Sequence, residues 1–189
     1  MELKERIVAA AIRLYFRRSL HFTMQEVAQS MHISKKTIYT VYPSKEALLL
    51  DMVDSLFASI HRRKRKVMEA PGPIEERVRT VIVALPEEYA ALDFRQLDEL
   101  DEKYPAVARR VRWHLETGWE PTIALLEEGM AQGSIRRVPV AVLRRMITAS
   151  IESLLDGEAM EETGASYRET LDAMIDIIMN GIRGDGHGA

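Results

Sequence analysis

Apolar residues recur three and four positions apart along most of the chain, and no segment alternates apolar and polar residues as a strand would. The N-terminal stripe contains Ile7, Ala10, Ala11, Leu14 and Tyr15. Stripes of this kind are typical of amphipathic helices, so we predict an all-α fold of about nine helices. We expect a helix-turn-helix domain over residues 1–46, a helical dimerisation and ligand-binding domain over 47–183, and a disordered tail over 184–189.

Two short helices close together are expected between residues 23 and 41. Thr23 and Glu26 have the spacing of a capping box, and Ser34 offers a second N-cap. Two helices that cross steeply need a small residue at the crossing and apolar residues between them. Ala28 meets the first requirement, and the second is met by Val27, Met31, Ile33, Ile38 and Val41. The turn then places His32 at a position that favours a left-handed backbone.

Charge is distributed unevenly along the chain. Residues 1–46 hold eight Lys or Arg and four Glu, a net charge of +4. The whole chain has 26 basic and 29 acidic residues, so the remaining 18 basic and 25 acidic residues give −7. A basic head on an acidic body is typical of a protein whose N-terminal part meets phosphates, although a small excess of this kind also arises by chance.

Residues 7–48 resemble the DNA-binding domain of the tetracycline-repressor (TetR) family. The resemblance is carried by IVAAAIRLY at 7–15, TMQEVA at 23–28, SKKTIY at 34–39 and YPSKEAL at 42–48, with matching spacing. Ser19 and His32 stand where the family commonly has glycine, and Val41 where a phosphate-contacting Tyr or His is frequent. The resemblance implies a homodimeric regulator, expected to be a repressor, that binds a palindromic operator in double-stranded DNA.

The same resemblance assigns DNA-contacting roles to the polar face of the second short helix and to a few residues on either side of that helix. Base edges would be contacted by Lys35, Lys36, Thr37 and Thr40, and phosphates by Thr23, Gln25, Tyr39 and Lys45. Ser34 is a further DNA-binding candidate. Three of these phosphate residues have an ordinary alternative: Thr23 is first a helix cap, Gln25 could simply be solvated, and Tyr39 could be half-buried packing. Arg62 to Lys66 form a basic run that we expect to be a solvated face of the fourth helix.

The body of the chain contains the long apolar stripes of the last two helices. They comprise Leu143, Ile147, Ile151 and Leu154, followed by Leu171, Met174, Ile175, Ile178 and Met179. The resemblance implies that these stripes pair two subunits in a four-helix bundle, and the alternative is that they pack within one subunit. Ser166 and Glu169 predict a capping box for the last helix. A single helix is expected over residues 105–133, kinked by Gly118 and Pro121.

A cavity in the helical body is a further implication of the resemblance, and it would hold an unknown, largely apolar small-molecule effector. Candidate lining residues are Phe57, Leu85, Tyr89, Phe94, Trp113, Trp119 and Met146. Aromatic residues and methionines on helices are more often plain core, so this alternative stays open for each of them.

Several other classes are disfavoured by composition. Cysteine is absent, and the five histidines show no metal-ligand spacing, so we expect no metal and no cofactor. There is no phosphate-binding glycine loop and no nucleophile with an evident base, which argues against an all-helical enzyme. Without a signal segment or an apolar run of membrane-spanning length, a cytoplasmic protein is expected. A TetR-like protein controlled by a protein partner, or a helical interaction module that has lost DNA binding, remains an alternative.

Overall fold

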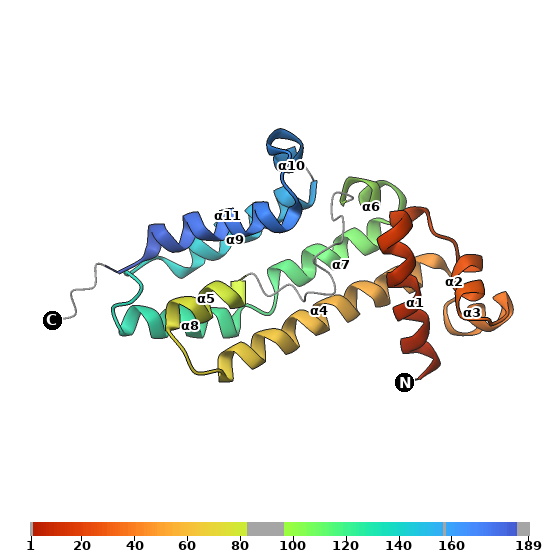
Figure 1. Ribbon diagram of the computed structural model, residues 1–189, viewed down its shortest axis with the longest axis horizontal. Coiled ribbons are helices and arrows are strands. Elements are labelled where there is room, and N and C mark those ends of the chain that lie inside the picture. The colour runs from red at the N-terminus through yellow and green to blue at the C-terminus, as the bar shows by residue number, and fades with distance from the viewer. Residues whose placement is uncertain (1, 83–96, 157, 185–189) are drawn as a thin grey trace.

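The computed structural model describes residues 2–82, 97–156 and 158–184, and in these ranges the chain is built from helices (Figure 1). Their bounds are α1 Leu3–Arg18, η1 Ser19–His21, α2 Met24–Ser30, α3 Lys35–Val41, α4 Lys45–Glu69, α5 Ile74–Ile82, α6 Leu97–Lys103, α7 Pro105–Glu116, α8 Glu120–Ala131, α9 Val140–Asp156, α10 Glu158–Thr163 and α11 Tyr167–Ile182. The predicted all-α class is confirmed.

Helices α1 to α3 form a head at one end of an elongated molecule, and α4 runs from this head along the body (Figure 1). Ile7, Val27 and Ile38 are fully buried at the centre of the head, and Ala28 is buried at the crossing of α2 and α3, as predicted. The head core also includes Leu48 and Met52, so it extends beyond the expected boundary at residue 46 into α4.

The helix caps of the head follow the sequence signals. Thr23 Oγ1 accepts a hydrogen bond from the Glu26 amide at 3.2 Å, and the Glu26 carboxylate accepts one from the Thr23 amide at 2.7 Å. Ser34 caps α3 through the amide of Thr37. His32 has φ +55°, as expected for the turn, and the family's other glycine position, Ser19, has φ +51°. The two substituted residues therefore keep the left-handed backbone, at a strain of about 1–2 kcal/mol each.

The body is a stack of helices around a second core. α9 and α11 lie together on one side, and α5 and α8 lie on the other (Figure 1). Val78 and Val81 of α5, Leu125 of α8, Ile147 of α9 and Ile175 of α11 meet there with no exposed surface. The predicted capping box starts α11, with Ser166 Oγ accepting from the Glu169 amide at 3.3 Å.

The region expected to be one kinked helix is two separate helices. α7 ends at Glu116 and α8 begins at Glu120, because Gly118 adopts φ +69° and ends the helical path. Pro121 lies in the first turn of α8, where its missing amide hydrogen costs no hydrogen bond. The short helix α10 was not anticipated. Within the described ranges, no helix is both long and apolar enough to cross a membrane.

Candidate DNA-binding interface

Helix α3 buries one side and exposes the other. Ile38 faces the head core with no exposed surface, while Lys35, Lys36, Tyr39 and Thr40 are exposed. This division follows from helical spacing, because position 38 lies on the opposite face from positions 36 and 40. The outward face therefore carries two ammonium groups, a phenol and a hydroxyl, all able to take part in hydrogen bonds.

Internal contacts hold this face in shape. Ser34 Oγ and Thr37 Oγ1 are 2.8 Å apart, and Thr40 Oγ1 donates to the Thr37 carbonyl at 2.7 Å. Lys35 Nζ lies 5.7 Å from the centre of the Tyr39 ring, which is 41% exposed. Tyr39 is thus a surface residue whose hydroxyl can reach a ligand, which argues against the alternative that it is buried packing.

The two residues near α2 that were predicted to contact phosphates differ in whether their polar side-chain groups are already hydrogen-bonded within the protein. Gln25 is exposed on the first turn of α2. Thr23 is also exposed, but its hydroxyl accepts from the Glu26 amide and donates to the Glu26 carboxylate at 3.0 Å. The cap therefore occupies the hydroxyl of Thr23, while the amide group of Gln25 is open to solvent.

Lys45 differs from the sequence expectation. Its ammonium donates to the Leu20 carbonyl and lies 4.5 Å from the centre of the Phe22 ring and 5.6 Å from that of Tyr104. Partial burial lowers the pKa of Lys45, while Glu99 opposes this shift. The ammonium predicted to hold a phosphate is instead directed at the protein, where it joins the head to the loop before α7.

The exit from α3 into α4 is fixed by a contact that sequence reasoning missed. The buried Tyr42 hydroxyl donates to the Asp51 carboxylate, one helical turn and a half into α4, and Lys4 Nζ lies 3.1 Å from the same carboxylate. Burial and this hydrogen bond raise the pKa of Tyr42. Asp51 thereby ties α1 and the end of α3 to α4, which fixes the direction in which α3 is presented.

Residues 7–52 match the family model of bacterial regulatory proteins, tetR family. The head of the chain therefore matches the DNA-binding domain of this family. The chain is also 27% identical, over 97% of both chains, to an uncharacterized HTH-type transcriptional regulator, YvaF, from Bacillus subtilis. Two solved structures share the fold: FadR of Bacillus subtilis in complex with stearoyl-CoA, and reduced NemR of E. coli. The first has TM-score 0.70 and 18% identity, covering 95% of this chain and 99% of FadR; the second has TM-score 0.70 and 16% identity, covering 98% and 100%.

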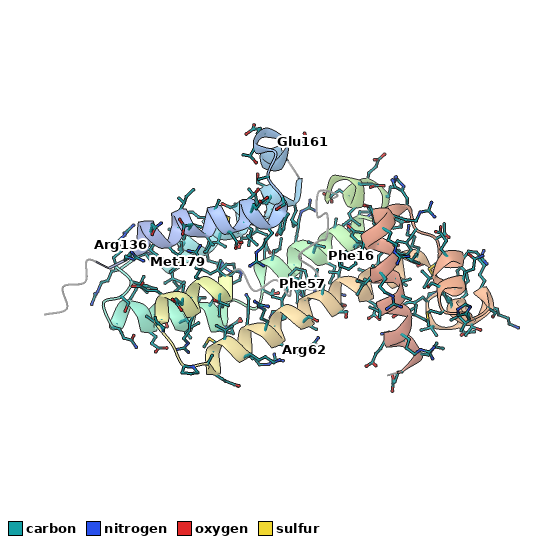
Figure 2. All side chains as sticks on the ribbon, in the orientation of Figure 1. Phe16, Phe57, Arg62, Arg136, Glu161 and Met179 are labelled. Carbon is teal, nitrogen blue, oxygen red and sulfur yellow. The ribbon has the colours of Figure 1, made fainter. Side chains whose placement is uncertain are left out.

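The helices that the TetR resemblance assigned to dimerisation bury most of their predicted stripes within the subunit. The residues packed inside the subunit are Leu143, Ile147, Leu154, Leu171, Ile175 and Met179. Figure 2 shows Met179 on the side of α11 that faces α5 and α8. Ile151, Met174 and Ile178 are partly buried. The strongest positions of both stripes thus pack in the core of the subunit, as in the alternative given for them.

The outer side of α9 and α11 carries an apolar groove in place of that stripe. Val142 and Met146 of α9 and Ile177 of α11 are 55%, 56% and 74% exposed, and the groove between them is almost wholly apolar. Sequence reasoning missed this side because both faces of these helices carry apolar residues. Met146, predicted to line an internal effector cavity, lies in this outer groove.

The other predicted effector residues are spread over the body. Phe57 and Trp119 are buried, whereas Trp113 is 52% exposed and lies on the surface. Leu85, Tyr89 and Phe94 lie outside the described residues. Phe57 and Trp119 therefore lie inside the body, where an effector cavity was predicted, whereas Trp113 and Met146 lie on the surface.

A polar cluster inside the body was not predicted. His114 of α7 stacks on Phe57 of α4, with ring centres 4.3 Å apart and planes within 7°. Its Nε2 lies 2.8 Å from Asp54 Oδ1, while its Nδ1 is buried without a hydrogen-bond partner. The signal for this cluster was available: positions 54, 57, 61 and 64 share one face of α4, and only position 57 is apolar. In the described ranges, no group of three or more side chains could hold a metal ion.

Proposed function

We propose that this protein is a TetR family regulator that binds a palindromic operator as a homodimer and is released from it by a small-molecule effector. The observation that carries the DNA-binding part is the exposed polar face of α3. Lys35 and Lys36 supply positive charge to it, and Ser34 and Thr37 hold its first turn in a fixed shape. A helix of this kind fits the major groove of DNA, with its N-terminal residues nearest the base edges.

A comparison of two substitutions and one control tests this interface. Lys36→Ala and Thr37→Ala should weaken binding to the operator by about tenfold while changing binding to random DNA much less, because base contacts carry the discrimination. Lys66→Ala removes the same charge from an exposed site about 30 Å along α4 from Lys45, so it should leave both affinities nearly unchanged.

The assay is fluorescence anisotropy with duplexes taken from upstream of the gene and with scrambled duplexes of equal length, over a range of salt concentrations. Equal losses on both duplexes for Lys36→Ala and Thr37→Ala would show that α3 does not read bases. Equal behaviour of Lys36→Ala and Lys66→Ala would remove α3 from the interface altogether.

The apolar groove on α9 and α11 supports dimerisation. Exposed apolar surface of this kind is costly in water, and a second copy related by a two-fold axis covers it with an identical surface. Two subunits joined along α9 and α11 would form a four-helix bundle and hold two heads for the two halves of a palindrome.

Ile177→Asp tests this assembly. Because Ile177 is 74% exposed, its replacement should leave the helix content unchanged but convert the dimer to monomer in sedimentation velocity and weaken operator binding. An Ile177→Asp protein that still sediments as the wild-type dimer would place the interface elsewhere.

Effector control is supported by the interior candidates Phe57 and Trp119 and by the fold shared with FadR, which was solved with stearoyl-CoA bound. A ligand that binds the body can change the separation of the heads only if it prefers one arrangement of the dimer. Release of operator DNA by a compound that also raises the unfolding temperature supports this part; release only by an added protein would favour control by a protein partner.

A further inference from the structure

We propose that the effector is amphiphilic, and that its anionic group binds between α4 and the α7–α8 junction, where His61, Lys64 and the first turn of α8 converge beside His114. This inference rests on the proposed effector control and adds the chemical class of the ligand. The anion would be a carboxylate or a phosphate.

The geometry starts from a single face of α4. His61 and Lys64 follow Phe57 at helical spacing, so all three face α7 and α8. Figure 2 shows Phe57 on the side of α4 that faces α7 and Arg62 on the opposite side. His61 packs directly on Gly118, since a Cβ there would lie 2.4 Å from His61 Cε1. Lys64 Nζ lies 5.5 Å from the centre of the Trp119 ring.

Two buried polar atoms at this junction have no partner. His114 Nδ1 lacks a hydrogen bond although its Nε2 is bound to Asp54, and its side chain is only 10% exposed. Thr122 Oγ1, on the first turn of α8, is also buried and unpaired. Buried polar groups are nearly always satisfied in proteins, so unpaired ones indicate a missing ligand or water. With Nε2 of His114 bonded to Asp54, Nδ1 is the atom of this ring left to meet a bound ligand.

The start of α8 adds donors of its own. Trp119 occupies the N-cap and provides no side-chain cap, and Pro121 has no amide hydrogen. The amides of Glu120 and Thr122 belong to the first turn and have no acceptor within the helix. The positive end of the helix dipole therefore lies beside Lys64 and His61, as in known anion sites.

Charge and burial also favour an anion. Burial lowers the pKa of Lys64 to about 8, and Glu120 of α8 opposes this shift. Burial, Lys64, His114 and Arg65 lower the pKa of His61. Asp54 of α4 is shared between His114 and Arg110 of α7, and Arg110 Nε lies 3.7 Å from its carboxylate. Arg77 of α5 donates hydrogen bonds to carbonyls of α4. Glu120 is thus the carboxylate that opposes the lowering of the pKa at both Lys64 and His61. A bound anion would further stabilise the charged form of Lys64.

The rings of Phe57 and Trp119 border the same junction and supply the apolar surroundings for the rest of the ligand. A ligand with both an anion and an apolar chain matches this arrangement. FadR, solved with stearoyl-CoA, shares the fold, and that ligand contains phosphates and an acyl chain.

The test uses the full chain and three probes with the same chain length: dodecanoate, dodecanoyl-CoA and neutral dodecanol. In isothermal titration calorimetry at pH 7, at least one anionic probe should bind about tenfold or more tightly than dodecanol, which is the usual scale for a hydrogen-bonded charge. Binding by dodecanoate alone identifies a carboxylate site, and binding by dodecanoyl-CoA alone identifies a phosphate site. Equal binding of all three, or of none, overturns the proposal.

Three variants of α4 link that preference to the site. Lys64→Met should abolish the advantage of the anionic probe, Lys64→Arg should restore it, and the exposed control Lys66→Met should leave it unchanged. Above pH 8 the wild-type affinity for the anion should fall by up to tenfold per pH unit, since free Lys64 then loses its proton, while Lys64→Arg keeps its affinity. A Lys64→Met protein that binds the anion like wild type overturns the proposal.

Operator release separates this proposal from effector control itself. If dodecanol releases the operator as well as the anions do, effector control stands and the anion site fails. If an anionic probe binds through Lys64 but never releases the operator, the site stands and its role as the effector switch fails.

Discussion

Replacing Gly118 by alanine should destabilise the protein by about 2–5 kcal/mol, for two separable reasons. Gly118 has φ +69°, where a non-glycine residue costs about 1–2 kcal/mol. In addition, the new Cβ would lie 2.4 Å from His61 Cε1, so the imidazole must move out of a packed site, at about 1–3 kcal/mol. Both costs fall on the junction between α7 and α8.

The chain provides matched controls for each part. Gly133 has φ +76° but nothing within 4 Å of its Cβ position, so Gly133→Ala should cost only the backbone strain of about 1–2 kcal/mol. Gly181 lies within α11, where its backbone is helical, and a Cβ there would also meet open space. Gly181→Ala should therefore cost nothing and could add up to about 1 kcal/mol through helix propensity.

A double-mutant cycle isolates the steric part. In a His61→Ala background, Gly118→Ala should cost about as much as Gly133→Ala, which gives a coupling of about 1–3 kcal/mol between positions 61 and 118. The measurement is urea unfolding followed by circular dichroism at 222 nm. If Gly118→Ala costs no more than Gly133→Ala, or if the His61→Ala background leaves its cost unchanged, the close packing of His61 on Gly118 is refuted.

Two further predictions concern the head. Lys45→Met should lower the free energy of unfolding by about 1–2 kcal/mol, because its ammonium donates to the Leu20 carbonyl. The salt dependence of DNA binding should stay unchanged. A salt slope reduced by about one unit, with full stability, would instead show that Lys45 contacts a phosphate. Tyr42→Phe should lower the free energy of unfolding by about 1–2 kcal/mol in the same urea titration, because the Asp51 carboxylate loses a buried donor. Tyr39→Phe removes an outward hydroxyl and should lower it by less than about 0.5 kcal/mol. Equal costs for the two tyrosines would contradict the role given to Asp51.

The head could be predicted in detail because its signals are local. Thr23 with Glu26 and Ser34 with Thr37 are caps that a few neighbouring residues determine, and the structure contains both. Ala28 and Ile38 follow from the demands of a steep crossing between two short helices. The hydrogen bond of Lys45 could not be predicted because its partner is distant in sequence: the Leu20 carbonyl lies 25 residues earlier, at a position that no local pattern indicates.

The α7–α8 break shows how one pattern can have two structural outcomes. Gly118 and Pro121 were interpreted as a kink in one helix, since proline removes a hydrogen bond from a continuing helix. The alternative is a stop and a start: glycine with positive φ ends one helix, and proline near the beginning of the next costs nothing there. His61 packs against the backbone at this break, where a Cβ on Gly118 would lie 2.4 Å from its Cε1.

The last two helices explain why the proposed dimer surface was harder to predict than the core. Periodicity identifies the most apolar face of a helix, and for α9 and α11 that face belongs to the subunit, with Ile147 and Ile175 fully buried. A helix that also contributes to a subunit interface needs a second apolar face. In the sequence of one helix, the few residues of that face cannot be told from apolar residues scattered over an ordinary surface. Val142 and Met146 lie four positions apart on α9 and Ile177 lies on α11, so the three form one face only when α9 and α11 are placed side by side. Sequence periodicity therefore predicts what a helix buries first, while the surface left for a second subunit depends on how the two helices are oriented by their shared core.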